Sequence, residues 1–163
     1  MAQPKRIYET PLPDFTSALR DGVRVMGLDI SKSVIGLALS DPDLKYATPL
    51  GALKRTKFTE DAAALLEVMD AHGAGGLILG LPLNMDGSEG PRAQSVKAFA
   101  RNLKPLTDAP IAFIDESLTT AEAEDALAAA SVKAEKRARR LDETAAAIIL
   151  QNALDTLNAP KDI

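Results

Sequence analysis

Short apolar segments rich in β-branched residues predict a sheet. The segments VRVMGLDI (23–30) and VIGLALS (34–40) are separated only by Ser-Lys-Ser, which predicts a hairpin of two strands. A third run over residues 48–53 is expected to extend the same antiparallel sheet. The runs GLILGLP (76–82) and PIAFI (110–114) predict two further buried strands.

The later part of the chain has the apolar spacing of helices. Helices are expected over residues 60–73, 91–104, 120–130 and 141–158. Gly73 supplies a glycine stop for the first helix, and Pro91 suits the first turn of the second. A meander of three strands, followed by strands that alternate with helices, predicts an α/β domain with a mixed five-stranded sheet flanked by helices.

Length and composition favour a single globular domain. The chain has 163 residues, of which 46% are hydrophobic, and it contains no Cys. We assign the domain to residues 22–158, with a short tail over 159–163. Residues 1–21 are expected to form an N-terminal arm, because its prolines interrupt helices and its apolar residues follow no period; its order stays open.

Charge and segment composition restrict location and partners. No segment has the length of a signal peptide's apolar region or of a spanning helix, so we expect a soluble cytoplasmic protein with no membrane role. The absence of Cys rules out thiol redox chemistry and thiolate metal sites. With 19 Lys+Arg against 23 Asp+Glu the formal net charge is -4, so nucleic acid must meet a local basic patch.

Three acids stand at places where chemistry is plausible. Asp29 ends the first strand on its Val25 face, and strand alternation separates Glu116 from Asp115. Asp142 lies on the apolar stripe of the last helix. Each acid also has an ordinary structural explanation: a turn-initiating Asp, a helix cap for the Asp115–Glu116 pair, and a helix-start Asp.

Carboxylates that gather at partly buried positions repel each other and need a cation. Mg²⁺ and Mn²⁺ prefer such oxygen ligands, whereas a chain with no Cys and one His is a poor zinc binder. Two ions about 4 Å apart can activate a water and stabilise the leaving oxygen of a phosphodiester. Metal-dependent phosphodiester hydrolysis is therefore the chemistry that these acids favour.

Four ordered motifs are similar to those of a known family. The segments GLDISKSVIGLALSDP, GLPLNMDGSEGPRA, DESLTTAEAE and LDETAAAIILQNALD resemble the YqgF/RuvX family of pre-16S rRNA nucleases, relatives of RuvC-type Holliday junction resolvases. The resemblance covers about residues 23–157. It implies a ribonuclease H-like fold and hydrolysis of structured RNA, or of branched DNA, with Mg²⁺ or Mn²⁺. By that resemblance Asp29, Glu116 and Asp142 are the catalytic metal ligands, with two ions present when substrate is bound.

Several polar and basic residues are candidates for contact with nucleic acid. The stretch KAEKRARR (133–140) reads either as a phosphate clamp or as an ordinary solvated surface. The loop before Arg92 reads either as a phosphate-facing helix start or as an Asx turn. His72, at a helix end, is expected to be structural. The candidates are Lys32, Asn84, Arg92, Thr119, Lys136, Arg137, Arg139 and Arg140.

Two departures from the family pattern keep alternatives open. Residues 30–34 replace a loop that is commonly Gly-Thr-Lys-Arg, and Ser117 replaces an arginine. They motivate a non-catalytic module that binds nucleic acid or assists ribosome assembly. A resolvase-like DNA nuclease is a second alternative. The sugar-kinase and actin-like ATPases share the fold but need two such domains, and this chain has room for one. A monomer and a homodimer are both compatible with the sequence.

Overall fold

The computed structural model describes residues 10–116 and 134–159, and in the second range it describes side chains from residue 143 onward. The helix expected over residues 120–130 lies outside these ranges. Within the described part of the chain, none of the helices combines the length and the apolar character that crossing a bilayer requires.

Five strands form one mixed sheet, as the sequence predicts. Its strands lie in the order β3-β2-β1-β4-β5, with β1, β2 and β3 antiparallel and with β4 and β5 parallel to β1. The strands are β1 (Arg24–Ile30), β2 (Val34–Ser40), β3 (Ala47–Lys54), β4 (Ala74–Leu81) and β5 (Ile111–Asp115). The predicted hairpin, its third strand and the two parallel strands are all confirmed.

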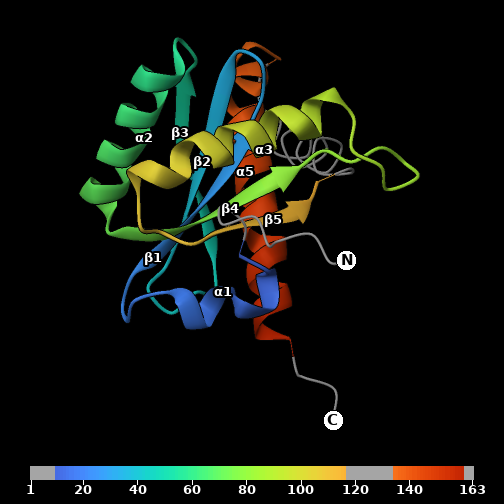
Figure 1. The fold of residues 1–163 in the computed structure, drawn as a ribbon. Helices are drawn as coiled ribbons and strands as arrows, with labels where there is room; N and C mark the ends of the chain where they lie inside the picture. The colour runs from blue at the N-terminus through green and yellow to red at the C-terminus, as the bar shows by residue number, and fades with distance from the viewer. Residues whose placement is uncertain (1–9, 117–133, 160–163) are drawn as a thin grey trace.

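Helices cover both faces of the sheet (Figure 1). On one face lie α2 (Phe58–His72) and α3 (Pro91–Leu103), the latter followed by the short 3-10 helix η1 (Lys104–Leu106). On the other face lie α1 (Leu12–Ala18) and the long helix α5 (Ala134–Asn158). Gly73 ends α2 in the left-handed conformation, with φ of 69°, as its glycine stop predicts.

The segment expected as an arm contains a packed helix. Phe15 of α1 is fully buried with the α5 side of the core, and the Thr10 N–H donates to the Ile111 carbonyl at 2.8 Å. Proline at the start of α1 does not oppose the helix, because the first helical position needs no intrahelical N–H donor. Residues from Thr10 onward therefore belong to the packed structure.

Helix α5 begins earlier than the sequence pattern indicates. It starts at Ala134 instead of near residue 141, so residue 142 lies inside the helix and the helix-start explanation for Asp142 is wrong. The apolar stripe that guided the prediction begins only where the helix meets the sheet. The preceding turns are basic, and their composition gave no apolar period.

A glycine brings α5 close to the sheet. A Cβ at Gly27 would lie 2.6 Å from Leu150 Cβ and 2.9 Å from the Ala146 carbonyl oxygen, so only glycine fits between strand and helix. Near the other end of α5, Gln151 accepts from the Ala47 N–H and Asn158 donates to the Leu44 carbonyl. The helix consequently runs antiparallel to β1, with its N-terminal part at the end of β1 that carries Asp29.

Candidate active site

Asp29 and Glu116 meet across β4, the strand that lies between β1 and β5. The β1–β4 register pairs Leu28 with Leu79, so Asp29 and Gly80 are the next residues along their strands. Glu116 directly follows β5, and its N–H donates to the Leu81 carbonyl at 3.1 Å, which continues the ladder. Both acids are buried, with 7% and 8% of their surfaces exposed, and their side chains share a hydrogen bond. The closeness of the two carboxyl groups favours the protonated form of Glu116.

Asp29 is not the residue that forms the hairpin turn. It lies inside β1 opposite Gly36, and the turn is closed by Ser31. The Ser31 N–H donates to the Val34 carbonyl at 2.9 Å, and the Ser31 hydroxyl accepts from the Val34 N–H at 3.2 Å. The turn-initiating explanation for Asp29 is therefore wrong, because a serine supplies that function two residues later.

The room for the two carboxylates comes from Gly80. A Cβ at this position would lie 2.7 Å from Glu116 Oε2 and 2.4 Å from Ile149 Cδ1. Any larger residue at position 80 would therefore press on the Glu116 carboxylate. At the point where the two acids converge, β4 therefore carries no side chain between them.

The environment of Glu116 favours its protonated form. Burial is the largest cause, and the negative charge and hydrogen bond of Asp29 follow; together they raise the pKa of Glu116 to about 8, from an ordinary 4.5. The positive charge of Arg92 acts in the opposite direction. Glu116 Oε1 is also buried and has no hydrogen-bond partner among the described residues. A buried, unsatisfied carboxylate oxygen beside a second acid is a suitable ligand set for a hard divalent cation.

Asp115 and Glu116 point to opposite sides, as strand alternation predicts. Ile111 and Phe113 belong to the α2 and α3 side of the core, whereas Ala112 and Ile114 belong to the α5 side, which Glu116 joins. Asp115 is exposed, and its charge is the smallest of the influences that raise the pKa of Glu116. The adjacent acids therefore have different environments, and only Glu116 contributes to the buried pair.

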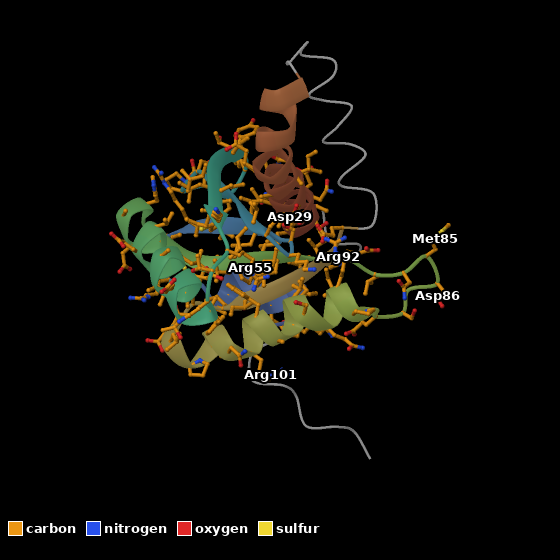
Figure 2. All side chains as sticks on the ribbon, turned by 90° about the horizontal axis from the view of Figure 1, so that it is seen from above. Asp29, Arg55, Met85, Asp86, Arg92 and Arg101 are labelled. Carbon is orange, nitrogen blue, oxygen red and sulfur yellow. The ribbon has the colours of Figure 1, made fainter. Side chains whose placement is uncertain are left out.

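Two hollows lie at this end of the sheet, and Arg92 lines both. The smaller, of about 240 Å³, includes Glu116, Asn84 and Arg92 in its lining. The larger, of about 520 Å³, includes Lys32 and Arg92. The view in Figure 2 looks down on this end of the sheet and labels Asp29, Arg55 and Arg92. The structure thus brings three of the predicted contact residues, Lys32, Asn84 and Arg92, to the neighbourhood of the acid pair.

The loop before α3 is organised by its own hydrogen bonds. Asp86 accepts from the Ser88 N–H at 2.9 Å, which is the Asx turn considered from the sequence. The Asn84 amide donates to the Ser88 hydroxyl at 3.0 Å, and Gly87 adopts φ of 85°. The loop carries Met85 and Asp86 outward from the sheet (Figure 2). Its local geometry needs no ligand, and Asn84 nevertheless lines the hollow that contains Glu116.

The remaining candidates lie where side chains are not described. Thr119 falls outside the described ranges. The backbones of Lys136, Arg137, Arg139, Arg140 and Asp142 lie in α5, but their side chains belong to the undescribed part. Among the described side chains, no group of three or more acids, His or Cys is placed to hold an ion, and Asp29 and Glu116 form a pair.

The sequence interpretation missed Arg55, Thr56 and Ser95, which line the larger hollow beside Lys32 and Arg92. The signal was present: the stretch Lys-Arg-Thr-Lys over residues 54–57 begins at the last residue of β3. Because β3 is antiparallel to β2, its end lies beside the hairpin turn that follows Asp29. A basic run at the end of such a strand is therefore near the site, although it is distant in sequence.

Comparison with known proteins identifies the family. The sequence profile of the RuvX family, described as Holliday junction resolvase, matches residues 23–156. A Chelativorans sp. (strain BNC1) protein provisionally named pre-16S rRNA nuclease is 56% identical over 138 residues, which cover 85% of this chain and 86% of that protein. A Brucella anthropi protein with the same provisional name is 46% identical over 148 residues, covering 91% and 90%.

Solved structures share the fold. RuvC of T. thermophilus, in complex with a Holliday junction substrate, has a TM-score of 0.52 at 14% identity, with 82% of this chain and 94% of that chain covered. The Fowlpox virus resolvase, in complex with Holliday junction DNA, has a TM-score of 0.52 at 8% identity, with 84% and 100% covered. These similarities confirm the ribonuclease H-like fold. With the profile match and the two close relatives, they lead to one conclusion: the chain belongs to the RuvX family.

Proposed function

We propose that this protein is a divalent-metal-dependent nuclease that hydrolyses phosphodiester bonds during maturation of pre-16S rRNA in the cytoplasm. The single observation that carries the proposal is the buried pair of Asp29 and Glu116 at the carboxyl end of the parallel strands β1, β4 and β5. Membership of the RuvX family and the provisional names of the relatives support the nuclease activity and the RNA substrate.

Asp29 and Glu116 would hold Mg²⁺ or Mn²⁺. The orphaned Glu116 Oε1 and the mutual repulsion of the two acids fit this role, because a cation would satisfy the oxygen and replace the proton of Glu116. When bound, a pair of such ions supplies an activated water and stabilises the leaving oxygen. The protein's own contribution is to hold the two carboxylates in place, close to each other and largely shielded from solvent.

Asp142 is the proposed third ligand. Ala146 of α5 lies against Gly27, and α5 runs antiparallel to β1. Residue 142 is four positions before Ala146 and therefore shares its helix face, one turn closer to the end of β1 that carries Asp29. This backbone placement supports a carboxylate on the third side of the pair.

The proposed contacts to nucleic acid surround the acid pair. Arg92 and Lys32 would bind phosphates near the scissile bond, and Asn84 would contact the substrate from the smaller hollow. The basic first turns of α5 would add salt-dependent affinity at the same end of the sheet. The residues proposed there are Lys136, Arg137, Arg139 and Arg140, with Thr119 on the preceding segment.

The proposal is tested by Asp29→Asn. The variant should lose Mn²⁺-dependent cleavage of a pre-16S rRNA fragment, and calorimetry should show weakened Mn²⁺ binding, while circular dichroism shows the unchanged fold. Asp70→Asn, which removes an exposed acid on α2, is the matched control and should cleave like the wild type. Undiminished cleavage by Asp29→Asn in a preparation free of other nucleases would reject the site.

A DNA substrate is the second candidate, and the description of the family as Holliday junction resolvase favours it. The same assay with a four-way DNA junction beside the RNA separates the two. Cleavage of the junction alone would replace RNA maturation by junction resolution. Tight binding of RNA without cleavage under any divalent ion would instead support the non-catalytic module.

A further inference from the structure

We propose that Arg55 is a phosphate-binding residue and that, together with Thr56 and Ser95, it forms a groove for the sugar-phosphate backbone next to the acid pair. The inference rests on the proposed nuclease function and extends it. It identifies where the strand that flanks the scissile phosphate would lie, and it assigns a role to residues at the end of β3 and the start of α3.

Arg55 is held in place from three sides. Its Nη1 donates to the Ser31 carbonyl at 3.0 Å, and its Nε lies 3.6 Å from Asp61 Oδ2. The guanidinium also lies over the Phe99 ring, 5.7 Å from the ring centroid. A guanidinium has five N–H donors; the Nη1 donor makes the hydrogen bond to Ser31, while the contact of Nε with Asp61 Oδ2 is an ion pair beyond hydrogen-bond distance, and Oδ2 has no hydrogen-bond partner among the described residues. A side chain fixed in this way loses little freedom when it binds an oxyanion.

Asp61 makes this arrangement rigid. The acid is 3% exposed, and its Oδ1 accepts from the Thr56 N–H at 2.9 Å, while the Thr56 hydroxyl donates to Glu60 Oε2 at 2.8 Å. One buried carboxylate thus fixes Arg55 and the backbone of Thr56 together. The side chain of Arg55 keeps 22% of its surface exposed, and that surface lines the larger hollow.

The lining of this groove has the chemistry of a phosphate site. Three cationic side chains from three different segments share it with hydroxyl groups, and the lining residues that the structure describes include no aromatic ring on which a base could stack. Arginine donors suit phosphate oxygens, and the Ser95 hydroxyl lies in the same lining, whereas the Ser31 and Thr56 hydroxyls donate to the Val34 carbonyl and to Glu60. The lining consists of Ile30, Ser31, Lys32, Arg55, Thr56, Pro91, Arg92 and Ser95.

The groove is continuous with the acid pair. Arg92 and Pro91 line both the larger hollow and the smaller hollow that contains Glu116. A strand whose phosphate reaches Glu116 can therefore continue past Arg92 toward Arg55. The opposing explanation is that Arg55 only fastens the Ser31 turn to β3, in which case its effect would be on the fold and not on binding.

Binding measured in EDTA separates these explanations, because cleavage is then absent. The probes are a pre-16S rRNA stem and a four-way DNA junction, each titrated at several salt concentrations. Arg55→Gln removes the proposed phosphate contact. Ser95→Glu places a negative charge in the groove without touching the contacts of Arg55. Gln94→Glu is the matched control, because this neighbouring exposed residue of α3 lies outside the lining.

Both groove variants should raise the Kd for the true substrate about tenfold at low salt, and Arg55→Gln should reduce the salt slope by about 0.7 to 0.9. Gln94→Glu should stay within about twofold of the wild type. The probe that loses affinity identifies whether the backbone is RNA or DNA. Unchanged Kd values for Ser95→Glu would overturn the groove, even if Arg55→Gln weakens binding, because the latter then acts through the turn.

The outcome can be distinguished from that of the nuclease proposal. A protein that binds the probe but never cleaves it still reports whether the groove holds the backbone. Thermal unfolding and Mn²⁺ binding of Ser95→Glu should match those of Gln94→Glu. If they do match and Ser95→Glu still binds the probe as tightly as Gln94→Glu, the phosphate site is rejected.

Discussion

Glu116 rests its carboxylate against Gly80, where a Cβ would come within 2.7 Å of Oε2. Both near neighbours of that missing Cβ, Glu116 Oε2 and Ile149 Cδ1, are the far ends of flexible side chains. A small residue at position 80 would therefore be accommodated by moving these ends. The displacement would fall on the group that we assign to metal binding.

Gly80→Ala should accordingly separate stability from activity. We expect the free energy of unfolding to fall by only about 1 kcal/mol, because flexible side-chain ends can move aside. Mn²⁺ affinity and cleavage should fall at least about tenfold, since Glu116 is displaced from Asp29. Calorimetry with Mn²⁺ and urea unfolding of the same preparation check this. Wild-type Mn²⁺ affinity in the variant would show that the carboxylate position is not critical.

Gly27→Ala should lower the free energy of unfolding more than Gly80→Ala does. Its Cβ would meet Leu150 Cβ and the Ala146 backbone carbonyl, which cannot turn away as a side-chain end can. We expect a loss of about 1 to 3 kcal/mol in the free energy of unfolding, as in overpacked cores. Urea unfolding measures this loss. A loss no larger than that of Gly80→Ala would contradict the close packing of α5 on β1.

The pKa of Glu116 links stability to pH in the metal-free protein. Because burial and Asp29 raise the pKa from 4.5 to about 8, the protonated carboxyl contributes stability that is complete below pH 4.5 and lost as the pH rises through 8. Glu116→Gln should remove this loss. In EDTA, its Tm should therefore exceed that of the wild type increasingly between pH 5 and 9, by about 3 °C per kcal/mol. A constant difference across this range would contradict the raised pKa.

The same proton should compete with the metal. Below pH 8 a divalent ion must displace the proton that Glu116 holds, so Mn²⁺ affinity should rise by up to about tenfold per pH unit and level off above pH 8. Calorimetry in two buffers with different ionisation enthalpies should show proton release on binding at pH 7 and much less at pH 9. Equal release at both values would exclude Glu116 as the group that loses the proton.

Arg92 should set the position of that pH dependence. Its positive charge lowers the pKa of Glu116, against the larger effects of burial and Asp29. Arg92→Gln should consequently shift the pH midpoint of Mn²⁺ binding upward. Arg101→Gln provides the matched control, because Arg101 lies on α3 away from the labelled Asp29 and Arg92 (Figure 2). If both variants leave the pH midpoint of Mn²⁺ binding unchanged, the charge of Arg92 does not influence the pKa of Glu116.

The sequence predicted the sheet well because its signals are local. Apolar runs, the Ser-Lys-Ser turn and the Gly73 stop each depend on neighbouring residues, and all are confirmed. The start of α5 was missed because a basic helical turn carries no apolar period. Strand alternation correctly separated Asp115 from Glu116, since that separation depends only on the direction of successive side chains.

The groove could not be predicted in the same way. Arg55, Arg92 and Lys32 come from three segments, and their proximity depends on the order of the strands. The order of the strands in the sheet cannot be deduced from how far apart the residues lie in the sequence. The role of Gly80 could not be predicted either, because the reason for a glycine there is the carboxylate of Glu116, which directly follows β5.

The hydrogen-bonded strands β1, β4 and β5 hold the backbones of Asp29 and Glu116 two strand spacings apart. Their side chains meet above β4, where Gly80 has no side chain. Strand spacing is nearly constant among proteins, at about 4.8 Å. The surrounding turn at Ser31 and the loop from Pro82 to Gly90 are free of that constraint. Sequence changes in these two loops would therefore alter which polynucleotide binds. The distance between Asp29 and Glu116 would stay the same, because the strands set it.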